Sequence, residues 1–359
     1  MKIKIDKSIV LSLNSKTGEF DSIVFIRQLT DSIMSGSHIY DLSKKIILGI
    51  IESNKLGLCE NRILKMYSER NTFQKSVKDN IDVHITFYHS EYVDEDIDSG
   101  FDILEFSEKN SDCNVLGIPK LVLEDLNDSK VYDAIIDKYR SENAVISNCE
   151  YNYQTIHGGG GRMGEVCSEN YNNPVNIFAI CDSDMDSPSC TLGNTANSVK
   201  SFFEMKGIAG NMIILDLHEV ENLLPIQFLK NKARPEQLPV LKFLEYSSSI
   251  KPESYLFFDL KESYKYSDIY SAERISSTKS QYWKELFDSY DRADNSTWRI
   301  DNNSPSKTLI NKLSSMLPHA INDLGEYSGD IEPLWLKEQW DFLGSILLNW
   351  FVGSEPMRL

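Results

Sequence analysis

The sequence predicts an α/β protein built on a mainly parallel sheet flanked by helices. Two observations predict this fold. From residue 119 onward, short apolar segments with strand character alternate with segments of helical periodicity. One apolar run, IFAICDSDMD (177–186), ends in three aspartates at alternate positions. Strands that alternate with helices form parallel sheets with covered faces, and such sheets bind ligands at the carboxyl ends of their strands.

Residues 118–230 contain this alternation and are expected to form one catalytic domain. PKLVLED is a strand candidate, and DSKVYDAIIDKYR after it has a helical period. A second strand, CEYNYQTI, runs into the glycine-rich HGGGGRMG. The remaining elements are VNIFAICD as a strand, NTANSVKSFFEMKG as a helix with a glycine stop, and NMIILDLHEVENLLP as a strand followed by a helix.

Residues 1–117 are expected to form a mainly helical domain with some strands. IDVHITFYHS alternates apolar and polar residues and predicts a strand, and the acidic EYVDEDIDSG after it predicts a loop. Apolar residues recur at helical spacing in DSIVFIRQLTDSIM, in IYDLSKKIILGIIESNKLG (with Ile39, Leu42, Ile46 and Ile50) and in NRILKMYSERNTFQKSV.

Residues 231–359 are expected to form an α-rich extension. KPESYLFFDLKES predicts a strand and a turn, and SDIYSAERISSTKSQYWKELFDSYDRADNS a helix followed by a loop. PLWLKEQWDFLGSILLNWFVG predicts an amphipathic helix that is too polar to cross a membrane. Its aromatic residues, Trp335, Trp340, Phe342 and Trp350, fit either the chain's own core or an interface with a second protein.

Composition limits the class of protein. The 359 residues are 41% hydrophobic, which is enough for a sizeable core. The sequence contains no run of about 18 apolar residues, so a membrane span is not expected. The first residues lack a signal-peptide core, and the six cysteines form no CxxC pair, so free thiols and a cytoplasmic location are expected. A net charge of -17 argues against a surface coated with basic residues for nucleic acid.

Acidic residues follow three successive predicted strands. They are Glu124 and Asp128 in LVLEDLND, Asp182, Asp184 and Asp186 in CDSDMD, and Glu219 and Glu221 in LHEVENLL. Carboxylate oxygens on rigid strand ends suit Mg²⁺ or Mn²⁺, and two such ions about 4 Å apart can stabilise both oxygens of a phosphodiester cleavage. Because residues i and i+2 of an extended segment point the same way, Asp182 and Asp184 are expected to share one cluster.

Each acidic group also has a simpler interpretation. Asp128 precedes a predicted helix and fits a helix cap. DSDMDS resembles a calcium loop, but Ser187 and Gly193 stand where that loop needs glycine and glutamate. The same segment fits the nucleophile motif of an aspartate-based phosphatase.

A strand ending in Glu124, followed about 58 residues later by a strand ending in Asp182-x-Asp184, resembles the Toprim domain of topoisomerases, primases and OLD-type nucleases. The Glu124-x-x-x-Asp128 spacing is similar to the OLD branch, whose paired acidic positions serve two metals. HEVENLL is similar to a segment of small Toprim proteins of bacterial antiviral defence, among them nucleases paired with an ATPase sensor. The resemblance covers residues 119–230, although Asp125 stands where many Toprim domains have glycine.

The resemblance implies a role for each acidic residue. Glu124 would bind metal and act as general base, Asp182 and Asp184 would be metal ligands, and Asp128 would assist a second ion. Glu221, or Glu219, would complete the cluster, and Asp186 is grouped with the metal ligands.

Basic and glycine residues are candidates for substrate binding. Gly159 and Gly160 in HGGGG would let backbone amides approach a phosphate, with Arg162 as an added cation, or they form a flexible turn. His157 beside them fits a proton donor or an exposed residue. Lys230 and Lys232 form a local basic patch that contacts nucleic acid or offsets nearby acids. Lys261, in FFDLKE, is a catalytic candidate because OLD-type nucleases use a lysine from outside the carboxylate motifs.

These expectations point to a Mg²⁺-dependent nuclease acting on DNA or RNA, including tRNA. The resemblance implies a toxic effector of anti-phage defence by abortive infection, controlled by an ATPase-type partner protein or by self-association into a homo-oligomer. Two alternatives remain open at this stage. One is an aspartate phosphatase with Asp182 as nucleophile, and the other is a regulatory subunit with a degenerate Toprim domain.

Overall fold

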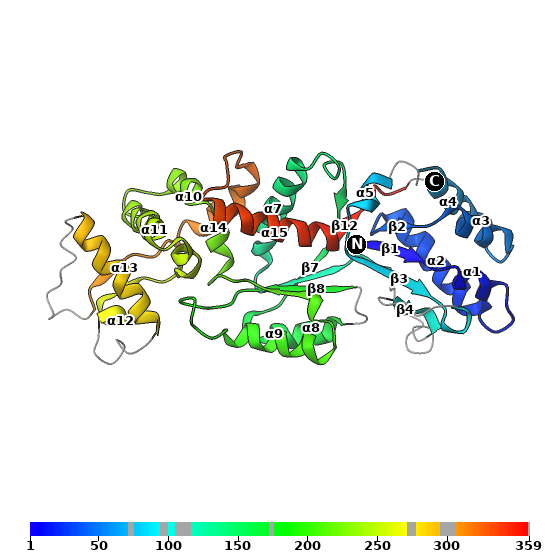
Figure 1. The fold of residues 1–359 in the computed structure, drawn as a ribbon, viewed down its shortest axis with the longest axis horizontal. Helices are drawn as coiled ribbons and strands as arrows, with labels where there is room; N and C mark the ends of the chain where they lie inside the picture. Colours follow the sequence, from blue (N-terminus) through cyan, green and yellow to red (C-terminus); the bar gives the residue numbers. More distant parts are fainter. Residues whose placement is uncertain are drawn as a thin grey trace.

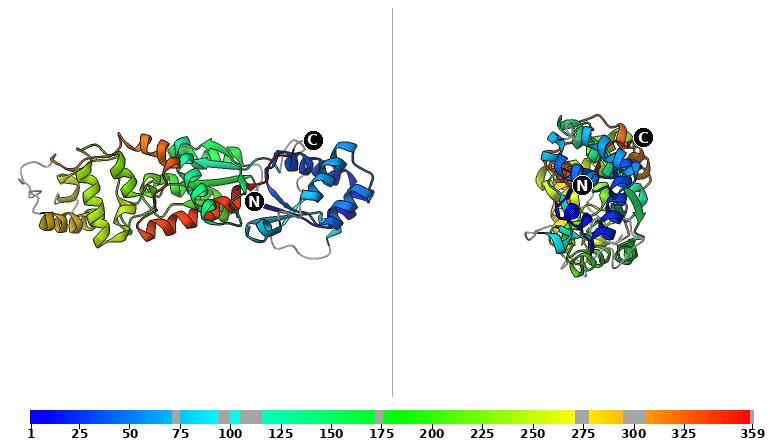
Figure 2. Two further views of the ribbon diagram at one scale, coloured as in Figure 1. Left: turned by 90° about the horizontal axis from the view of Figure 1, so that it is seen from above. Right: turned by 90° about the vertical axis from the view of Figure 1, so that its right-hand side faces the viewer.

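The computed structural model describes residues 1–70, 75–93, 100–104, 116–171, 176–270, 278–294 and 306–357. The molecule is elongated, and an N-terminal α/β part, a central sheet and a C-terminal group of helices follow one another along its long axis (Figures 1 and 2). It is an α/β fold whose two larger sheets are parallel, as the alternation of strands and helices predicts.

The N-terminal part contains a four-stranded parallel sheet in the order β2-β1-β3-β4. Its strands are β1 (Lys2–Ile5), β2 (Ile39–Asp41), β3 (His84–Tyr88) and β4 (Gly100–Asp102). Its helices are α1 (Ser8–Leu13), α2 (Glu19–Ser35), α3 (Lys44–Glu52), α4 (Leu58–Arg70) and α5 (Lys75–Asp79). Helices α2, α3, α4 and α5 and strand β3 fall in segments where they were expected, whereas α1, β1, β2 and β4 were not expected. Most of the expected acidic loop after β3, residues 94–99, lies outside the described residues.

The helix predicted from residue 39 begins only at Lys44. Ser43 explains the late start, because its side chain accepts a hydrogen bond from the Ile46 N–H at 3.2 Å and caps the helix. Ile39 lies before this cap and joins β2, where it pairs with Lys2 of β1. The prediction of one continuous helix was therefore wrong for residues 39–43.

The central sheet has four parallel strands in the order β7-β5-β8-β9. They are β5 (Lys120–Leu123), β7 (Gln154–His157), β8 (Ile177–Cys181) and β9 (Met212–Ile214). Helices α7 (Ser129–Glu142) and α15 (Leu334–Phe351) cover one face, and α8 (Met163–Asn170) and α9 (Asn194–Met205) cover the other (Figure 1). All five residues of β8 are buried, as expected for a strand covered on both faces.

The chain leaves β5 toward α7 and leaves the neighbouring β8 toward α9, on the opposite face of the sheet. Alternate residues confirm the two faces, since Leu121 and Phe178 lie in one core cluster while Val122 and Ala179 lie in the other. Adjacent strands whose connections depart to opposite faces leave a crevice at their carboxyl ends. This point of the sheet therefore positions the candidate site.

The C-terminal part is mainly helical. It comprises α10 (Ile226–Lys232), α11 (Leu238–Ile250), the 3-10 helix η7 (Pro252–Phe257), α12 (Tyr266–Tyr270), α13 (Thr278–Asp294), α14 (Leu317–Asp323) and a short β10 (Tyr264–Lys265) paired with β11 (Thr308–Ile310). The strand expected in KPESYLFFDLKES is wrong, because Pro252 begins a 3-10 helix whose aromatic Tyr255 and Phe257 fill the core.

Helix α15 packs along α7 and contributes to the chain's own core. Trp340 and Trp350 are buried, and Trp340 Nε1 donates to the Leu223 carbonyl at 2.8 Å. Phe342 points outward and is 56% exposed. The core interpretation therefore holds for these two tryptophans. In the described part of the chain, no helix combines the length and the apolar character needed to cross a membrane.

Candidate active site

The ends of β5 and β8 bring Glu124 and Asp182 into contact. Glu124 directly follows β5, and Asp182 directly follows β8, its neighbour in the sheet. The Asp182 N–H donates to Glu124 Oε1 at 3.1 Å. The contact arises because strands paired in register end at the same level, and it joins two residues that the sequence predicted to meet.

Asp182 is enclosed by other carboxylates. Burial raises the pKa of Asp182 well above its usual value, and the charges of Glu124 and Glu221 raise it further. Burial also raises the pKa of Glu124, whereas the hydrogen bond from the Asp182 N–H acts to lower it. The charge of Asp184 raises the pKa of Glu124 further. The carboxylates around Asp182 keep its pKa raised although the charge of Lys261 acts in the opposite direction, and such a group of acids favours a bound cation.

Asp128 does not cap the helix that follows it, since its side chain accepts no hydrogen bond from the first turn of α7. It ends the 3-10 helix η3 (Leu126–Asp128), and its Oδ2 accepts the Asp125 N–H at 3.1 Å, as in a capping box. The same carboxylate is buried, and burial raises its pKa to about 7, with a further contribution from Glu221. Asp128 therefore belongs to the capping box of η3, with Asp125 as the N-cap, and it belongs electrostatically to the carboxylate cluster.

The third acidic group follows β9 in a 3-10 helix, η6 (Val220–Leu223), rather than in the α-helix expected there. Glu219 and Glu221 are both buried. Burial raises the pKa of Glu219 to about 7, and the charge of Glu221 contributes to the rise. Lys261 Nζ lies 3.1 Å from Glu219 Oε2 and 2.8 Å from Glu221 Oε2, so the lysine joins the cluster from the C-terminal part.

Lys261 is a cation held among these acids. Burial acts to lower the pKa of Lys261, but the charges of Glu221 and Glu219 outweigh it and raise the pKa above its usual value. The backbone around Lys261 is fixed, because Asp259 Oδ1 accepts the Lys261 and Glu262 N–H groups, both at 2.9 Å. The structure thus places Lys261 beside the carboxylates, whereas in the sequence only the resemblance to OLD-type nucleases singled it out.

The backbone conformation that positions Asp184 was not predicted from the sequence. The strand ends at Cys181, and Asp184 has a left-handed backbone with φ of 54°. The expectation that Asp182 and Asp184 point the same way from an extended segment was therefore wrong. The Asp184 N–H donates to the His218 carbonyl at 3.1 Å, and a Cβ atom at Gly193 would fall 2.1 Å from Asp184 Oδ2. Gly193 thus allows the close approach of the Asp184 side chain.

Asp186 is paired with other residues at the rim of the cluster. Its Oδ1 lies 2.6 Å from Lys279 Nζ and 3.9 Å from His218 Nδ1. Its carbonyl accepts a hydrogen bond from Trp283 Nε1 at 2.8 Å. The third aspartate of the motif therefore ties the loop to α13, and Lys279 already neutralises its charge.

Within the described ranges, His218, Glu219 and Asp259 form the group of three potential metal ligands whose donor atoms lie close together, whereas Glu124, Asp182 and Asp184 do not gather as tightly. One donor atom from each lies within 4.8 Å of the others. Burial acts to raise the pKa of Asp259, but the hydrogen bond and charge of His218 outweigh it and keep the pKa below its usual value. The sequence analysis did not single out His218, and the signal for it was its position directly before Glu219 in HEVENLL.

The glycine-rich loop lies beside the end of β5. A Cβ atom at Gly158 would fall 2.8 Å from the Leu123 carbonyl, one residue before Glu124. Gly159 and Gly160 have positive φ angles of 69° and 57°, which glycine adopts without strain. Arg162 is exposed, and its Nε lies 3.0 Å from Glu165 Oε2. The loop therefore begins beside the strand end that precedes Glu124.

The remaining basic candidates lie outside the carboxylate cluster. Lys230 Nζ lies 2.6 Å from Glu245 Oε2, and Lys232 Nζ lies 2.5 Å from Asp323 Oδ2. Both lysines thus offset acids on neighbouring helices, which is the simpler of the two interpretations. His157 is exposed.

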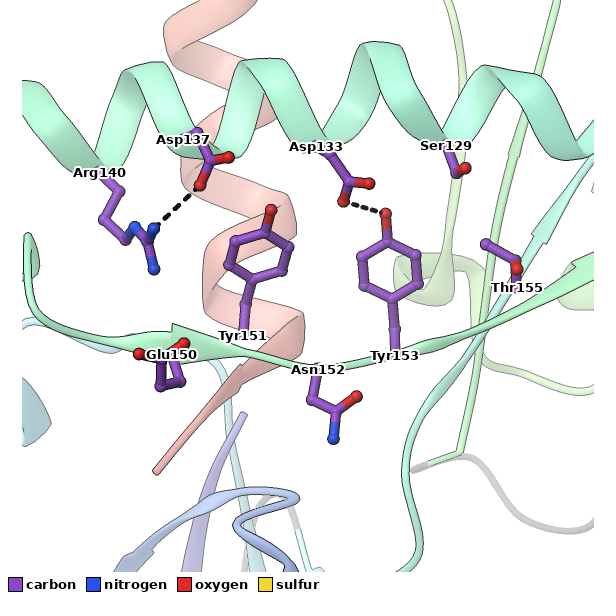
Figure 3. Close-up of a pocket in the computed structure, with 9 residues that line it drawn as sticks. All are labelled: Ser129, Asp133, Asp137, Arg140, Glu150, Tyr151, Asn152, Tyr153 and Thr155. Carbon is purple, nitrogen blue, oxygen red and sulfur yellow. Dashed lines mark hydrogen bonds and ion pairs between the residues drawn. The ribbon is translucent and has the colours of Figure 1, made fainter. Parts of the chain in front are cut away.

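A separate polar groove of about 540 Å³ lies between α7 and the segment that contains β6 (Glu150–Tyr151) and β7 (Figure 3). Tyr153 Oη donates to Asp133 Oδ1 at 2.5 Å, and Arg140 Nη2 lies 3.0 Å from Asp137 Oδ1. Because these groups already pair with one another, we place the chemistry at the carboxylate cluster and not in this groove.

Comparisons of the chain with family models, with curated proteins and with solved structures found no match. The function is therefore argued from the carboxylate cluster at the ends of β5, β8 and β9.

Proposed function

We propose that this chain is a metal-dependent nuclease that hydrolyses phosphodiester bonds. The observation that carries the proposal is the contact between Glu124 and Asp182 where the connections of the sheet diverge. Asp128 and Glu221 lie close enough to raise the pKa of Asp182, so carboxylates from three strand ends share one cluster.

The donor set suits Mg²⁺ or Mn²⁺. Glu124, Asp182 and Asp184 offer hard oxygen ligands on or next to rigid strand ends. Their mutual repulsion would be relieved by a divalent cation. When bound, such an ion supplies Lewis-acid stabilisation of phosphoryl charge and lowers the pKa of a coordinated water.

The chain's own residues have distinct tasks in this proposal. Glu124 accepts a proton from the attacking water, and its raised pKa brings it closer to the range in which a general base works at neutral pH. Lys261 places a fixed positive charge beside the cluster. The backbone of Gly159 and Gly160 is free of Cβ atoms and can approach a phosphate, with Arg162 nearby.

The substrate class and the biological role rest on the resemblance to Toprim nucleases of bacterial defence. We propose DNA or RNA, including tRNA, as the substrate and a toxic anti-phage effector as the role. A chain with a net charge of -17 meets nucleic acid slowly, which favours an assembly in which a partner protein brings the substrate.

One panel of reactions tests the proposal. The purified chain is incubated with plasmid, single-stranded DNA, total RNA and p-nitrophenyl phosphate, each with Mg²⁺, Mn²⁺ or EDTA. We expect cleavage of a nucleic acid only with a divalent ion. Asp182→Asn should lower the rate by more than about 100-fold. Asp137→Asn, which removes an exposed carboxylate from α7, should leave the rate unchanged.

The other outcomes of the panel are equally informative. Hydrolysis of p-nitrophenyl phosphate without nuclease activity would replace the proposal with an aspartate phosphatase. Inactivity on every substrate, with and without a candidate partner protein, would favour a regulatory subunit.

A further inference from the structure

Lys261 occupies a position that suits a cation. Its ammonium group lies within 3.1 Å of one oxygen from each of two buried carboxylates, Glu219 and Glu221. The two carboxylate side chains are each only 7% exposed, whereas that of Lys261 is 47% exposed. The lysine therefore reaches in from the solvent side and neutralises acids that water scarcely reaches.

Both oxygens of Glu219 are engaged by the chain's own groups in this arrangement. Its Oε1 accepts the Leu260 N–H at 2.9 Å, and its Oε2 faces Lys261. The group formed by His218, Glu219 and Asp259 needs a Glu219 oxygen, so the lysine engages this potential metal site too.

The other half of the cluster is different. Within the described ranges, no lysine or arginine forms an ion pair with Glu124, Asp182 or Asp184. Lys261 thus forms ion pairs on one side of the cluster, whereas its charge reaches Glu124 and Asp182 on the other side without an ion pair.

We propose that the Lys261 ammonium replaces one of two divalent cations, so that the cluster binds a single Mg²⁺ or Mn²⁺ ion at Glu124, Asp182 and Asp184. The inference rests on the proposed metal-dependent function and specifies its metal stoichiometry. A second ion would have to displace an ammonium held by two short ion pairs and by a fixed backbone turn. Removing the ammonium would leave Glu219 and Glu221 as an uncompensated buried pair, which attracts a cation.

Counting bound Mn²⁺ tests the inference without any activity measurement. Equilibrium dialysis combined with electron paramagnetic resonance of free Mn²⁺ gives the number of ions per chain. We expect one ion for the wild type and two for Lys261→Met. The matched control is Lys337→Met, because Lys337 Nζ also bridges two carboxylates, Glu142 at 2.7 Å and Asp341 at 2.6 Å, but on an exposed surface. This control should keep one ion.

A further substitution locates the ions. Asp182→Asn should lose the single ion of the wild type, and the double variant Lys261→Met/Asp182→Asn should retain one.

Each result has a defined meaning. Two ions on the wild type would overturn the inference and leave the proposed nuclease standing, whereas no ion would remove the metal-dependent function as well. A Lys261→Met chain with native circular dichroism and only one ion would also overturn the inference. If that variant does not fold, the wild-type count decides.

Discussion

At the scale of single residues, Gly193 determines where Asp184 lies. Its φ of -64° and ψ of 170° are open to any residue, so the backbone does not require glycine. The close contact with Asp184 does require glycine, because a Cβ atom added at Gly193 would lie 2.1 Å from Asp184 Oδ2 and 2.7 Å from Asp184 Cβ. We predict that Gly193→Ala displaces Asp184 and weakens Mn²⁺ binding by about tenfold or more, as calorimetric titration would measure.

A matched control separates this effect from a general effect of alanine. Gly210 has open space around the corresponding position, so Gly210→Ala should bind Mn²⁺ like the wild type. Equal affinity in both variants would show that Asp184 is not a ligand.

The buried acids predict an unusual dependence of stability on pH. Burial raises the pKa of Asp128 and of Glu219 to about 7, whereas exposed carboxyl groups titrate near 4. The folded state therefore binds more protons than the unfolded state between these values. Without metal, the free energy of unfolding should fall as the pH rises from about 4 to about 7, by roughly 1.4 kcal/mol for each unit of raised pKa.

Urea unfolding in EDTA at pH 5 and pH 7.5 measures this trend. Asp128→Asn should reduce the fall, and Mg²⁺ should weaken it because the ion stabilises the ionised carboxylates. A metal-free protein whose stability rises with pH over this range would contradict the prediction.

The sequence predicted the contact between residues at the ends of adjacent strands, but not the contacts with other parts of the fold. Glu124 and Asp182 could be paired because adjacent parallel strands end together. The contacts of Asp186 with Lys279 and His218 could not be predicted in this way, because neither partner directly follows an adjacent strand. Lys279 lies on α13, far along the chain, and the docking of that helix depends on tertiary packing. For Asp184, the backbone turns to a positive φ immediately after the strand, and periodicity does not report such a turn.

At the scale of elements, α15 supports the acidic η6 helix. The Trp340 Nε1 hydrogen bond to the Leu223 carbonyl is buried and lies two residues after Glu221. Trp340→Phe leaves that carbonyl without this partner, and we predict a loss of about 1–3 kcal/mol in the free energy of unfolding. Chemical denaturation measures the loss. Trp335→Phe on the same helix, whose ring lies 5.9 Å from that of Tyr255, should cost less.

Long elements were predictable and short ones were not. The helices α2, α9 and α15 follow clear apolar spacing. Strands such as β2 and β4 have three residues each, too few for a periodic pattern, and they exist because β1 and β3 pair with them. The sequence predicted a longer helix at η6 and a strand at η7. Both are short 3-10 helices whose apolar residues fill the core and follow no regular spacing.

At the scale of the whole molecule, the two ends of the described chain meet. The Met1 amino group is buried and donates to the carbonyls of Trp350 and Val352, at 2.8 and 3.0 Å. Burial lowers the pKa of this amino group to about 4. Strand β12 (Val352–Gly353) pairs with β6, and the Ser354 N–H donates to the Gly36 carbonyl at 3.1 Å. The last elements thus join the N-terminal part to the central sheet.

This closure predicts that a chain ending at residue 333 does not assemble the site. It lacks α15, which covers one face of the central sheet together with α7 and carries the tryptophan that holds η6. We expect rapid proteolysis and no Mn²⁺ binding, and we expect a separate peptide of residues 334–357 to restore both properties. A shortened chain that binds Mn²⁺ normally would contradict this prediction.

The order in which a ribosome makes the chain gives this closure a further meaning. The acidic residues of the cluster emerge first, but α15 and β12 are synthesised more than 100 residues after Glu221. Until then α7 alone covers its face of the central sheet, and the Leu223 carbonyl of η6 lacks the hydrogen bond from Trp340. We therefore expect a nascent polypeptide to carry all the acidic residues of the cluster without a completed site. Under the proposed function, the nuclease would exist in the cell only as finished molecules, at a moment set by translation.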